Sequence, residues 1–290
     1  MKPTDLRGIL QYIPRFREKT FVIAVDGAVV TDENFANLLL DVAVLRSLNI
    51  RVVLVHGAAA QIQALGAERG ITPSNLDGTG ITDAPTLQLA LTAANRLTHE
   101  ILEGLSTNDL RAASPNAVIA SPMGILQGVD QLFTGKVERV DTEMLQTLLA
   151  AGITPVVPPL GFDGDGKTYR VTSDTIALAI ATALKATKIL FITTSDGLFH
   201  QGKLLKQVLA ADLRALIEKK ELSPEDTARA RAAAAACLQG IPRVHLINGR
   251  TDESLLAEVF SNEGVGTLIY ADEFQQIRPA QKKDIRALLR

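Results

Sequence analysis

The sequence predicts an α/β protein whose core is a mainly parallel, doubly wound sheet in two lobes. Continuously apolar runs of strand length alternate along the 290 residues with segments whose apolar positions repeat at three and four. Residues 21–25 are apolar throughout, and so are residues 52–55 of the strand that begins at Arg51, as in strands covered on both faces. Residues 31–45 between them have the apolar spacing of one helix, so this unit is most simply a right-handed crossover between parallel strands. Ligand sites are then expected at the carboxyl ends of the strands.

The remaining elements continue this alternation. Helix starts are marked by capping residues, among them Thr82 or Asp83, Thr172 and Ser223. The expected helices cover residues 58–69, 85–105, 144–150, 172–184, 210–219, 225–238 and 253–260. The expected strands cover residues 117–120, 128–140, 154–157, 168–171, 188–192, 243–247 and 266–270.

An amphipathic segment over residues 5–16, interrupted by Pro14, precedes the first strand and therefore lies outside the sheet. It is either a capping or oligomer-contact helix, or a helix whose Tyr12 covers a ligand site. The spacing of its apolar residues does not distinguish the two interpretations.

Composition excludes several classes of function. The formal charge is −2 and the sequence pI is about 6.1, so the chain lacks the basic excess that binds nucleic acid. The single cysteine, Cys237, cannot form an internal disulfide or a Cys-based zinc site, and this favours a reduced, cytoplasmic setting. We expect no metal site, because the four histidines lack metal-ligand spacing. No signal peptide and no apolar run of membrane-spanning length is present, so we expect neither secretion nor membrane insertion.

Two glycine turns follow the first two strands, at Asp26-Gly27 and at His56-Gly57. Phosphoryl transfer needs backbone N–H donors and cations around a phosphate. The acidic Asp26 has the wrong charge for that role, and the alanines at 58–60 hinder close approach of the backbone. Both turns are therefore poor phosphate sites.

Other candidates lie near later strand ends. Asp174 is either a helix cap or a catalytic acid, and the turn at residues 193–197 contains Ser195 and Asp196. The loop at residues 262–266 is either an ordinary loop or a site where Glu263 and carbonyl groups bind a cationic ligand.

The order of these segments resembles the amino-acid kinase family, most closely the kinase-like domain of N-acetylglutamate synthases and the related N-acetylglutamate kinases. The resemblance covers about residues 5–276 and implies a three-layer αβα fold. It rests on residues 21–27, 55–62, 81–87, 133–137, 158–161, 171–174, 243–250 and 262–267.

Compared with the kinases, the phosphate clamp is altered. Ala24 replaces a lysine, Asp26 replaces a glycine, and residues 58–60 replace a glycine run. The helix from residue 225 lacks the expected Pro-Lys, while Gly80 and Arg170 replace an arginine and an asparagine of the kinase pattern. Asp174 alone remains of the catalytic set. The resemblance therefore implies a vestigial nucleotide site at Gly27, Gly57, Ser195 and Asp196 without appreciable kinase activity, and ATP is expected only if the chain is instead an N-acetylglutamate kinase.

The resemblance to the synthases implies that the chain binds L-arginine as a feedback effector. The resemblance implies an arginine site formed by Tyr12, Lys203, His245, Arg250, Glu263, Gly264 and Gly266.

The same resemblance divides the chain into an N-terminal extension (1–19), a kinase-like domain (20–276) and the start of an acetyltransferase domain (277–290). Acetyl-CoA would bind the rest of that domain, so we expect either a piece of a longer protein or a stand-alone sensor that works with an acetyltransferase domain or subunit. The resemblance also implies a homo-oligomer, a dimer or a hexamer. A non-catalytic oligomerisation scaffold is the third interpretation.

Overall fold

The computed structural model describes residues 12–261 and 264–271. Its central unit is the predicted crossover, in which β1 (Thr20–Val25) and β2 (Arg51–His56) lie parallel and are connected through α3 (Gly27–Val30) and α4 (Phe35–Ser47). Within the described residues, eight strands form one sheet in the order β14-β16-β15-β11-β1-β2-β8-β3. All neighbours are parallel except β15 and β16.

The other strands of this sheet are β3 (Ala112–Ala113), β8 (Thr154–Val157), β11 (Lys188–Thr193), β14 (Gln207–Leu209), β15 (Arg243–Asn248) and β16 (Thr267–Tyr270). The larger helices are α5 (Ala59–Arg69), α6 (Ala84–Thr107), α7 (Thr142–Ala150), α8 (Ser173–Ala183), α9 (Ala210–Glu218), α10 (Pro224–Leu238) and α11 (Ser254–Val259).

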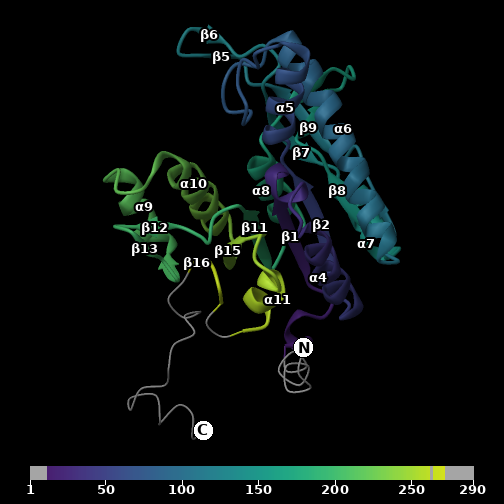
Figure 1. Cartoon of the computed structure of the whole chain (residues 1–290), viewed down its shortest axis with the longest axis vertical. Helices are drawn as coiled ribbons and strands as arrows, with labels where there is room; N and C mark the ends of the chain where they lie inside the picture. The colour runs from purple at the N-terminus through teal and green to yellow at the C-terminus, as the bar shows by residue number, and fades with distance from the viewer. Residues whose placement is uncertain (1–11, 262–263, 272–290) are drawn as a thin grey trace, which may run out of the picture.

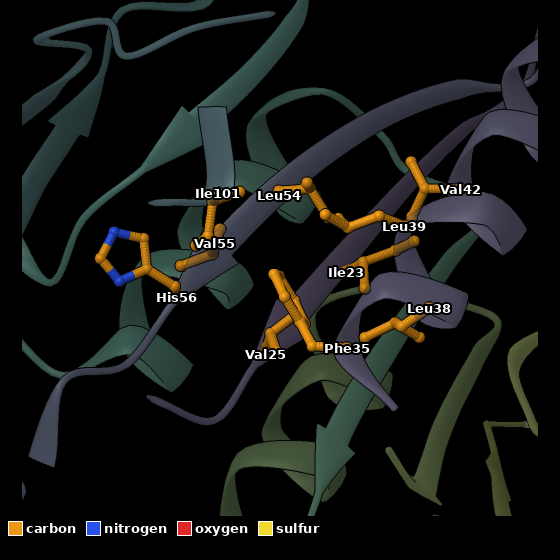
Figure 2. Close-up of a pocket in the computed structure, with 10 residues that line it drawn as sticks. All are labelled: Ile23, Val25, Phe35, Leu38, Leu39, Val42, Leu54, Val55, His56 and Ile101. Atoms are coloured by element: carbon orange, nitrogen blue, oxygen red, sulfur yellow. The ribbon is translucent and has the colours of Figure 1, made fainter. Parts of the chain in front are cut away.

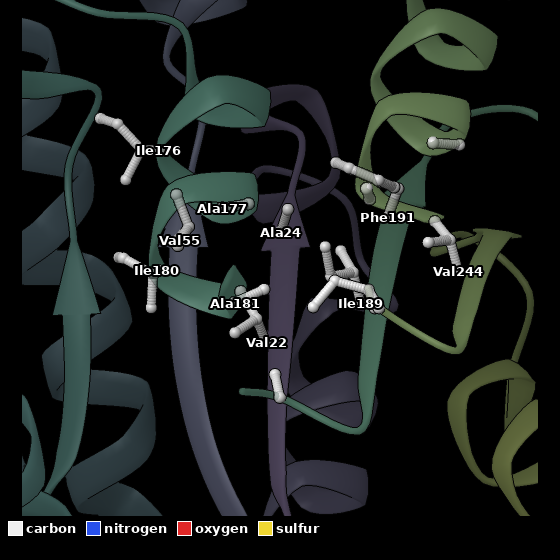
Figure 3. Packing of buried hydrophobic residues seen from close by; sticks show 14 of the residues in the cluster. Val22, Ala24, Val55, Ile176, Ala177, Ile180, Ala181, Ile189, Phe191 and Val244 are labelled. Atoms are coloured by element: carbon white, nitrogen blue, oxygen red, sulfur yellow. The ribbon is translucent and has the colours of Figure 1, made fainter. Parts of the chain in front are cut away.

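Helices cover both faces of the sheet, as the sequence predicts (Figure 1). Successive residues of β1 point to opposite faces, because side chains alternate along a strand. Val22 and Ala24 pack with α8 and α10, whereas Phe21 and Ile23 pack with α4 and α6. The fold is therefore the three-layer αβα arrangement. Figure 3 shows the α8 face, where Ala24 and its neighbours form a closely packed apolar layer.

The packing around Ile180 gives a test of this core. Ile180 of α8 is fully buried between the sheet and its neighbours. Ile180→Val should lower the free energy of unfolding by about 1 kcal/mol, because it removes one buried methylene group. Ile125→Val, at a side chain that is 71% exposed, should leave the urea midpoint unchanged. Equal midpoints for the two variants would contradict this assignment of the core.

A second sheet extends from one end of the first. Within the described residues it has four strands, in the order β10 (Thr168–Arg170), β9 (Leu160–Phe162), β4 (Val118–Pro122) and β7 (Gly135–Val140). The segment over residues 128–140, whose alternation favours a hairpin at the rim of the sheet, contains two strands that pair with other strands and not with each other. Its first part, β6 (Val129–Asp130), pairs with β5 (Ile125–Leu126) in a separate hairpin.

Other short elements are absent from the sequence prediction. They are α3, β3, β14 and the hairpin of β12 (Phe199–His200) and β13 (Lys203–Leu204). Pro14 lies in the first turn of α2 (Ile13–Phe16), where its missing N–H costs nothing, so the helix continues to Phe16.

A small apolar cavity lies between α4 and the strands β1 and β2 (Figure 2). Its volume of about 10 Å³ is at the lower limit for one water molecule. His56 at one end is its only polar lining residue, and the His56 Nε2 lies 2.8 Å from the Thr98 hydroxyl oxygen. Burial lowers the pKa of His56 to about 4, so this side chain is neutral near pH 7. Both ring nitrogens of His56 already have hydrogen-bond partners, and the other lining residues are apolar, so we interpret the cavity as part of the core.

Candidate functional site

The two glycine turns meet at the carboxyl ends of β1 and β2. A Cβ atom on Gly57 would lie 3.6 Å from the Gly27 nitrogen and 3.4 Å from the Ser173 hydroxyl oxygen. Asp174 follows in the first turn of α8, where burial raises the pKa of its carboxyl group and the charge of Arg229 opposes that rise. The structure thus brings Gly27, Gly57 and Asp174 together at the carboxyl ends of β1 and β2.

Asp26 forms an ion pair with Arg229 at this edge of the sheet. Its Oδ2 accepts a hydrogen bond of 3.0 Å from the Arg229 Nη2 of α10, and its Oδ1 accepts one of 3.2 Å from the Ala28 N–H. Both side chains are mostly buried. Sequence reasoning did not identify Arg229 as a cation beside Asp26, because it lies in the Ala-rich helix α10.

Ser195 and Asp196 lie at the carboxyl end of β11, which is the neighbour of β1 on the side away from β2. The Thr193 hydroxyl accepts from the Ser195 N–H at 3.1 Å, and Asp196 Oδ1 accepts from Asn248 Nδ2 at 2.8 Å. These residues therefore border the same edge of the sheet as Gly27 and Gly57.

A separate pocket lies over the amino-terminal halves of β11 and β15, on the face of the sheet that α11 covers. It lies away from the strand ends where the sequence predicts sites. Its floor is Lys188, Arg243 and His245, with Lys188 and Arg243 directly opposite each other in the strand register. The walls come from α2, α11 and the loop before β16. The lining residues are Tyr12, Arg15, Phe16, Lys188, Arg243, His245, Glu258, Val259, Ser261, Gly264 and Leu268.

A chain of hydrogen bonds connects three buried side chains of this pocket. The distance from His245 Nδ1 to Glu258 Oε1 is 2.6 Å, and that from His245 Nε2 to Lys188 Nζ is 3.2 Å. A carboxylate only accepts, so His245 carries its proton on Nδ1 and accepts from the lysine at Nε2. Glu258 Oε2 also accepts from the N–H groups of Val265 at 2.6 Å and Gly266 at 2.9 Å.

Burial controls the charges of this chain. It lowers the pKa of Lys188 to about 7, with Arg243 and Arg15 lowering it further and Glu258 opposing them. Burial and the neighbouring Lys188 lower the pKa of His245 to about 4. The pKa of Glu258 is also lowered: burial acts to raise it, but the hydrogen bond and charge of His245 and the two backbone N–H groups outweigh that effect. The pocket therefore holds a carboxylate and a lysine whose pKa lies well below that of an exposed lysine.

Aromatic side chains close the pocket beside α2. The Tyr12 and Phe16 rings stack with centroids 6.0 Å apart, and Tyr12 meets the edge of Phe260 at 5.9 Å. The Lys188 Nζ lies 4.9 Å from the centre of the Phe16 ring, within the range of a cation–π contact. The N-terminal helix thereby contacts the buried lysine directly.

The structure brings some of the expected arginine-site residues together and leaves others apart. Tyr12, His245 and Gly264 line the pocket, and Gly266 donates its N–H to Glu258. Glu263 lies outside the described residues. Two residues expected at this site are placed elsewhere: Lys203 lies in the β12–β13 hairpin, and Arg250 follows β15, where its Nε is 3.1 Å from Asp32 Oδ2.

Sequence reasoning did not identify Glu258 and Lys188. Each has a signal that could have found it, because each is a charged residue in an otherwise apolar pattern. Lys188 opens a strand whose next four residues are apolar, and Glu258 lies next to Val259 and three residues after Leu255 on the buried side of α11.

Within the described ranges no cluster of three or more His, Cys, Asp or Glu residues is placed to hold a metal ion. None of the helices in that part of the chain is long and apolar enough to cross a membrane.

Comparison with known proteins identifies the family and the relatives of this chain. Residues 19–248 match the model of the amino acid kinase family. The amino-acid acetyltransferase of Pseudomonas fluorescens strain Pf-5 is 36% identical over 98% of this chain and 68% of its own length. That of Vibrio cholerae serotype O1 is 34% identical over 94% of this chain and 66% of its own length.

Solved structures show the same relationship. N-acetylglutamate synthase from Neisseria gonorrhoeae, complexed with coenzyme A and L-arginine, is 30% identical with a TM-score of 0.87, and the match covers all of this chain and 70% of that one. The same synthase with coenzyme A and N-acetyl-glutamate gives 32% identity and a TM-score of 0.87, over 98% of this chain and 67% of that one. Together with the matching family model, these likenesses show that the chain belongs to the amino acid kinase family and, within it, to the group of the amino-acid acetyltransferases, or N-acetylglutamate synthases.

Proposed function

We propose that this chain is the arginine-sensing, kinase-like regulatory part of an N-acetylglutamate synthase. The observation that carries the proposal is the pocket with charges of both signs, in which the Glu258 carboxylate lies close to the Lys188 amine and the Arg243 guanidinium. L-arginine presents a guanidinium and an ammonium group to a carboxylate, and its own carboxylate to the cations. A homologous synthase of 30% identity, solved with L-arginine, supports this choice of ligand.

Glu258 is the residue best placed to recognise the cationic group. Among the described residues it accepts from three donors, namely His245, Val265 and Gly266. A carboxylate has about four acceptor positions, so one remains for a ligand. In this proposal Glu258 takes the role that the sequence assigns to Glu263. The free space in the pocket is only about 20 Å³, so Tyr12 and Phe16 must move outward to admit the ligand.

Isothermal titration calorimetry tests the proposal directly. The chain should bind L-arginine saturably, and it should bind two analogues much more weakly: L-citrulline, which lacks the guanidinium charge, and agmatine, which lacks the carboxylate. Absence of arginine binding, or equal affinity for citrulline, would overturn the assignment. An unchanged oligomer without arginine affinity would favour the scaffold interpretation.

Arginine affinity should fall as the pH rises above about 7. A ligand carboxylate beside Lys188 would raise the pKa of that lysine from its value of about 7 in the free chain. The complex would then bind more protons than the free chain, so affinity decreases by up to about tenfold per pH unit between pH 7 and 8.5. The measurement is calorimetry across that range. Lys188→Met should flatten the slope, and an equal slope in this variant would argue against the lysine.

We expect no appreciable phosphorylation of N-acetyl-L-glutamate by ATP. Ala24 is uncharged and points into the apolar layer beneath α8, and the Asp26 carboxylate lies at the carboxyl end of β1 in contact with Arg229. Loss of cations from a phosphoryl-transfer site removes most of its transition-state stabilisation. Robust turnover in a coupled assay of ADP release, dependent on N-acetylglutamate, would show instead that the chain is an acetylglutamate kinase.

The proposal extends to the rest of the expected arrangement. We infer a homo-oligomer, either a dimer or a hexamer, in the cytoplasm, in which acetyl transfer from acetyl-CoA belongs to an acetyltransferase domain or subunit. In this proposal the N-terminal extension is residues 1–19, and the start of the acetyltransferase domain is residues 277–290. Sedimentation analysis with and without arginine measures the oligomer.

A further inference from the structure

The helix α11 carries Glu258, but its own sequence does not cap its amino terminus. The residue before the helix, Glu253, has a φ of 55°, in the left-handed region, and its side chain makes no capping hydrogen bond. The first N–H groups of a helix have no partner within the helix and need acceptors from elsewhere. A helix of only six residues also gains little from its own hydrogen bonds. The position of α11 therefore depends on the groups that hold it from outside.

Asp41 of α4 supplies the acceptor that α11 lacks. Its carboxylate accepts a hydrogen bond from the N–H of Leu256, the third residue of α11. This N–H is one that the side chain of an ordinary N-cap residue satisfies. Asp41 is 8% exposed and lies among the buried apolar residues of α4, which packs against α11. Asp41 therefore acts as an N-cap that comes from another helix.

The start of α4 also holds the segment that leads into α11. The Asn34 Nδ2 donates a hydrogen bond of 2.9 Å to the Gly249 carbonyl oxygen, and the Arg250 Nε lies 3.1 Å from the Asp32 Oδ2. With the Asp41 contact, α4 and the turn before it therefore hold the beginning of α11 at three points.

The other end of α11 faces the pocket around Lys188. Glu258 lies two residues after Leu256, in the last turn of the helix, and its carboxylate accepts from three donors in and beside that pocket. One buried carboxylate, Asp41, thus holds the first turn, and a second, Glu258, leaves the last turn toward the ligand. Because the helix has fewer than two turns, a shift of its first turn also shifts Glu258.

We propose that Asp41 is a positioning residue, which caps α11 from α4 and thereby sets the place of Glu258 in the pocket around Lys188. The inference rests on the proposed function for the identity of the ligand. The cap itself can be measured without any ligand.

The protonation of Asp41 makes this cap depend on pH. Burial raises the pKa of Asp41 from 3.8 to about 7; the Leu256 N–H opposes that rise, and the charges of Asp252 and Glu253 add to it. The folded chain thus holds this proton more tightly than the unfolded chain, so Asp41 lowers the free energy of unfolding as the pH rises between these two values. Asp41→Asn keeps an acceptor oxygen and does not titrate. Its urea midpoint should therefore rise relative to that of the unmodified chain over this pH range.

Calorimetry with L-arginine at one pH tests the effect on the pocket. Asp41→Leu removes the acceptor and keeps the side chain compatible with its apolar neighbours, so arginine affinity should fall about fivefold, the size expected for a lost helix cap. Asp41→Asn should bind nearly as the unmodified chain does, because its oxygen still accepts from Leu256. Asp41→Ala is a second deletion variant should Asp41→Leu not fold. Glu100→Gln, at an exposed carboxylate of α6, is the matched control and should change nothing.

Hydrogen exchange without arginine tests the cap directly. The amides of α11 should exchange faster in Asp41→Leu than in Asp41→Asn or the unmodified chain, while the urea midpoint shows that the fold is kept. Equal exchange in all three proteins would overturn the cap. If the unmodified chain binds arginine and Asp41→Leu binds it equally tightly, Asp41 does not position Glu258. If the unmodified chain binds no arginine, the proposed function fails, and the exchange measurement decides on the cap alone.

Discussion

Glu258→Gln should weaken L-arginine binding by at least about 100-fold. The substitution keeps the shape of the side chain and removes its charge, so a buried guanidinium would lose its charged acceptor, a loss that typically costs about 2–5 kcal/mol of binding energy. Glutamine has one acceptor oxygen, so it can accept either from His245 or from the N–H groups of Val265 and Gly266 but not from both, and the variant should also lose some stability. The measurement is calorimetry, with circular dichroism to confirm that the variant is folded.

Two further variants test whether the loss of arginine binding is specific to Glu258. Glu253→Gln, at the exposed start of the same helix, should bind arginine as the unmodified chain does. Glu263→Ala, at the residue that the sequence favours for this role, should have a smaller effect than Glu258→Gln. A large loss for Glu263→Ala together with normal binding by Glu258→Gln would reverse the assignment of the carboxylate.

Gly266→Ala should destabilise the chain by about 3 kcal/mol and also abolish arginine binding. A Cβ atom at this position would overlap the backbone carbonyl oxygen of Leu246 and approach the Ile247 side chain to 2.8 Å. The obstacle is the backbone of the adjacent strand, which cannot move aside cheaply. The shift would also displace an N–H group that holds Glu258. Urea unfolding measures the first effect and calorimetry the second.

Gly164→Ala is the matched control for this substitution. Gly164 lies in a turn with no atom near the position of the added methyl group, and its backbone is not in the left-handed region. Its urea midpoint and arginine affinity should match those of the unmodified chain. Equal midpoints for Gly266→Ala and Gly164→Ala would mean that the loop before β16 can shift without cost.

The central part of the fold could be predicted because its signals are local. The apolar runs of β1, β2 and β11 and the helical spacing of α4 and α6 each lie within one segment, and the pairing of β1 with β2 follows from the short crossover. The elements that escaped prediction, such as β3 and the β12–β13 hairpin, have two residues per strand. So short a stretch has no periodicity, and it becomes a strand only through its neighbours.

The site could be predicted only in part, for a related reason. Resemblance pointed to Tyr12, His245 and Gly264, which do meet in one pocket. It did not show that Glu258 and Lys188 are buried, because the burial of a charge depends on partners that lie far away in the sequence. His245, which contacts both of them, is 57 residues from Lys188. The pocket with both charges lies over the amino-terminal halves of the strands, whereas the strand-end rule directs attention to their carboxyl ends.

The strand β11 is six residues long and carries Lys188 at its start and Thr193, beside Ser195, at its end. At about 3.3 Å per residue, the two sites that it connects are separated by roughly 20 Å of rigid, fully buried backbone. Neither site contributes a side chain to the other. Substitutions at the edge of the sheet beside Gly27 and Gly57 can therefore accumulate over many generations without disturbing the pocket around Lys188. Substitutions in that pocket can likewise accumulate without disturbing the edge. A lineage built on this sheet can lose one activity completely and still refine the other.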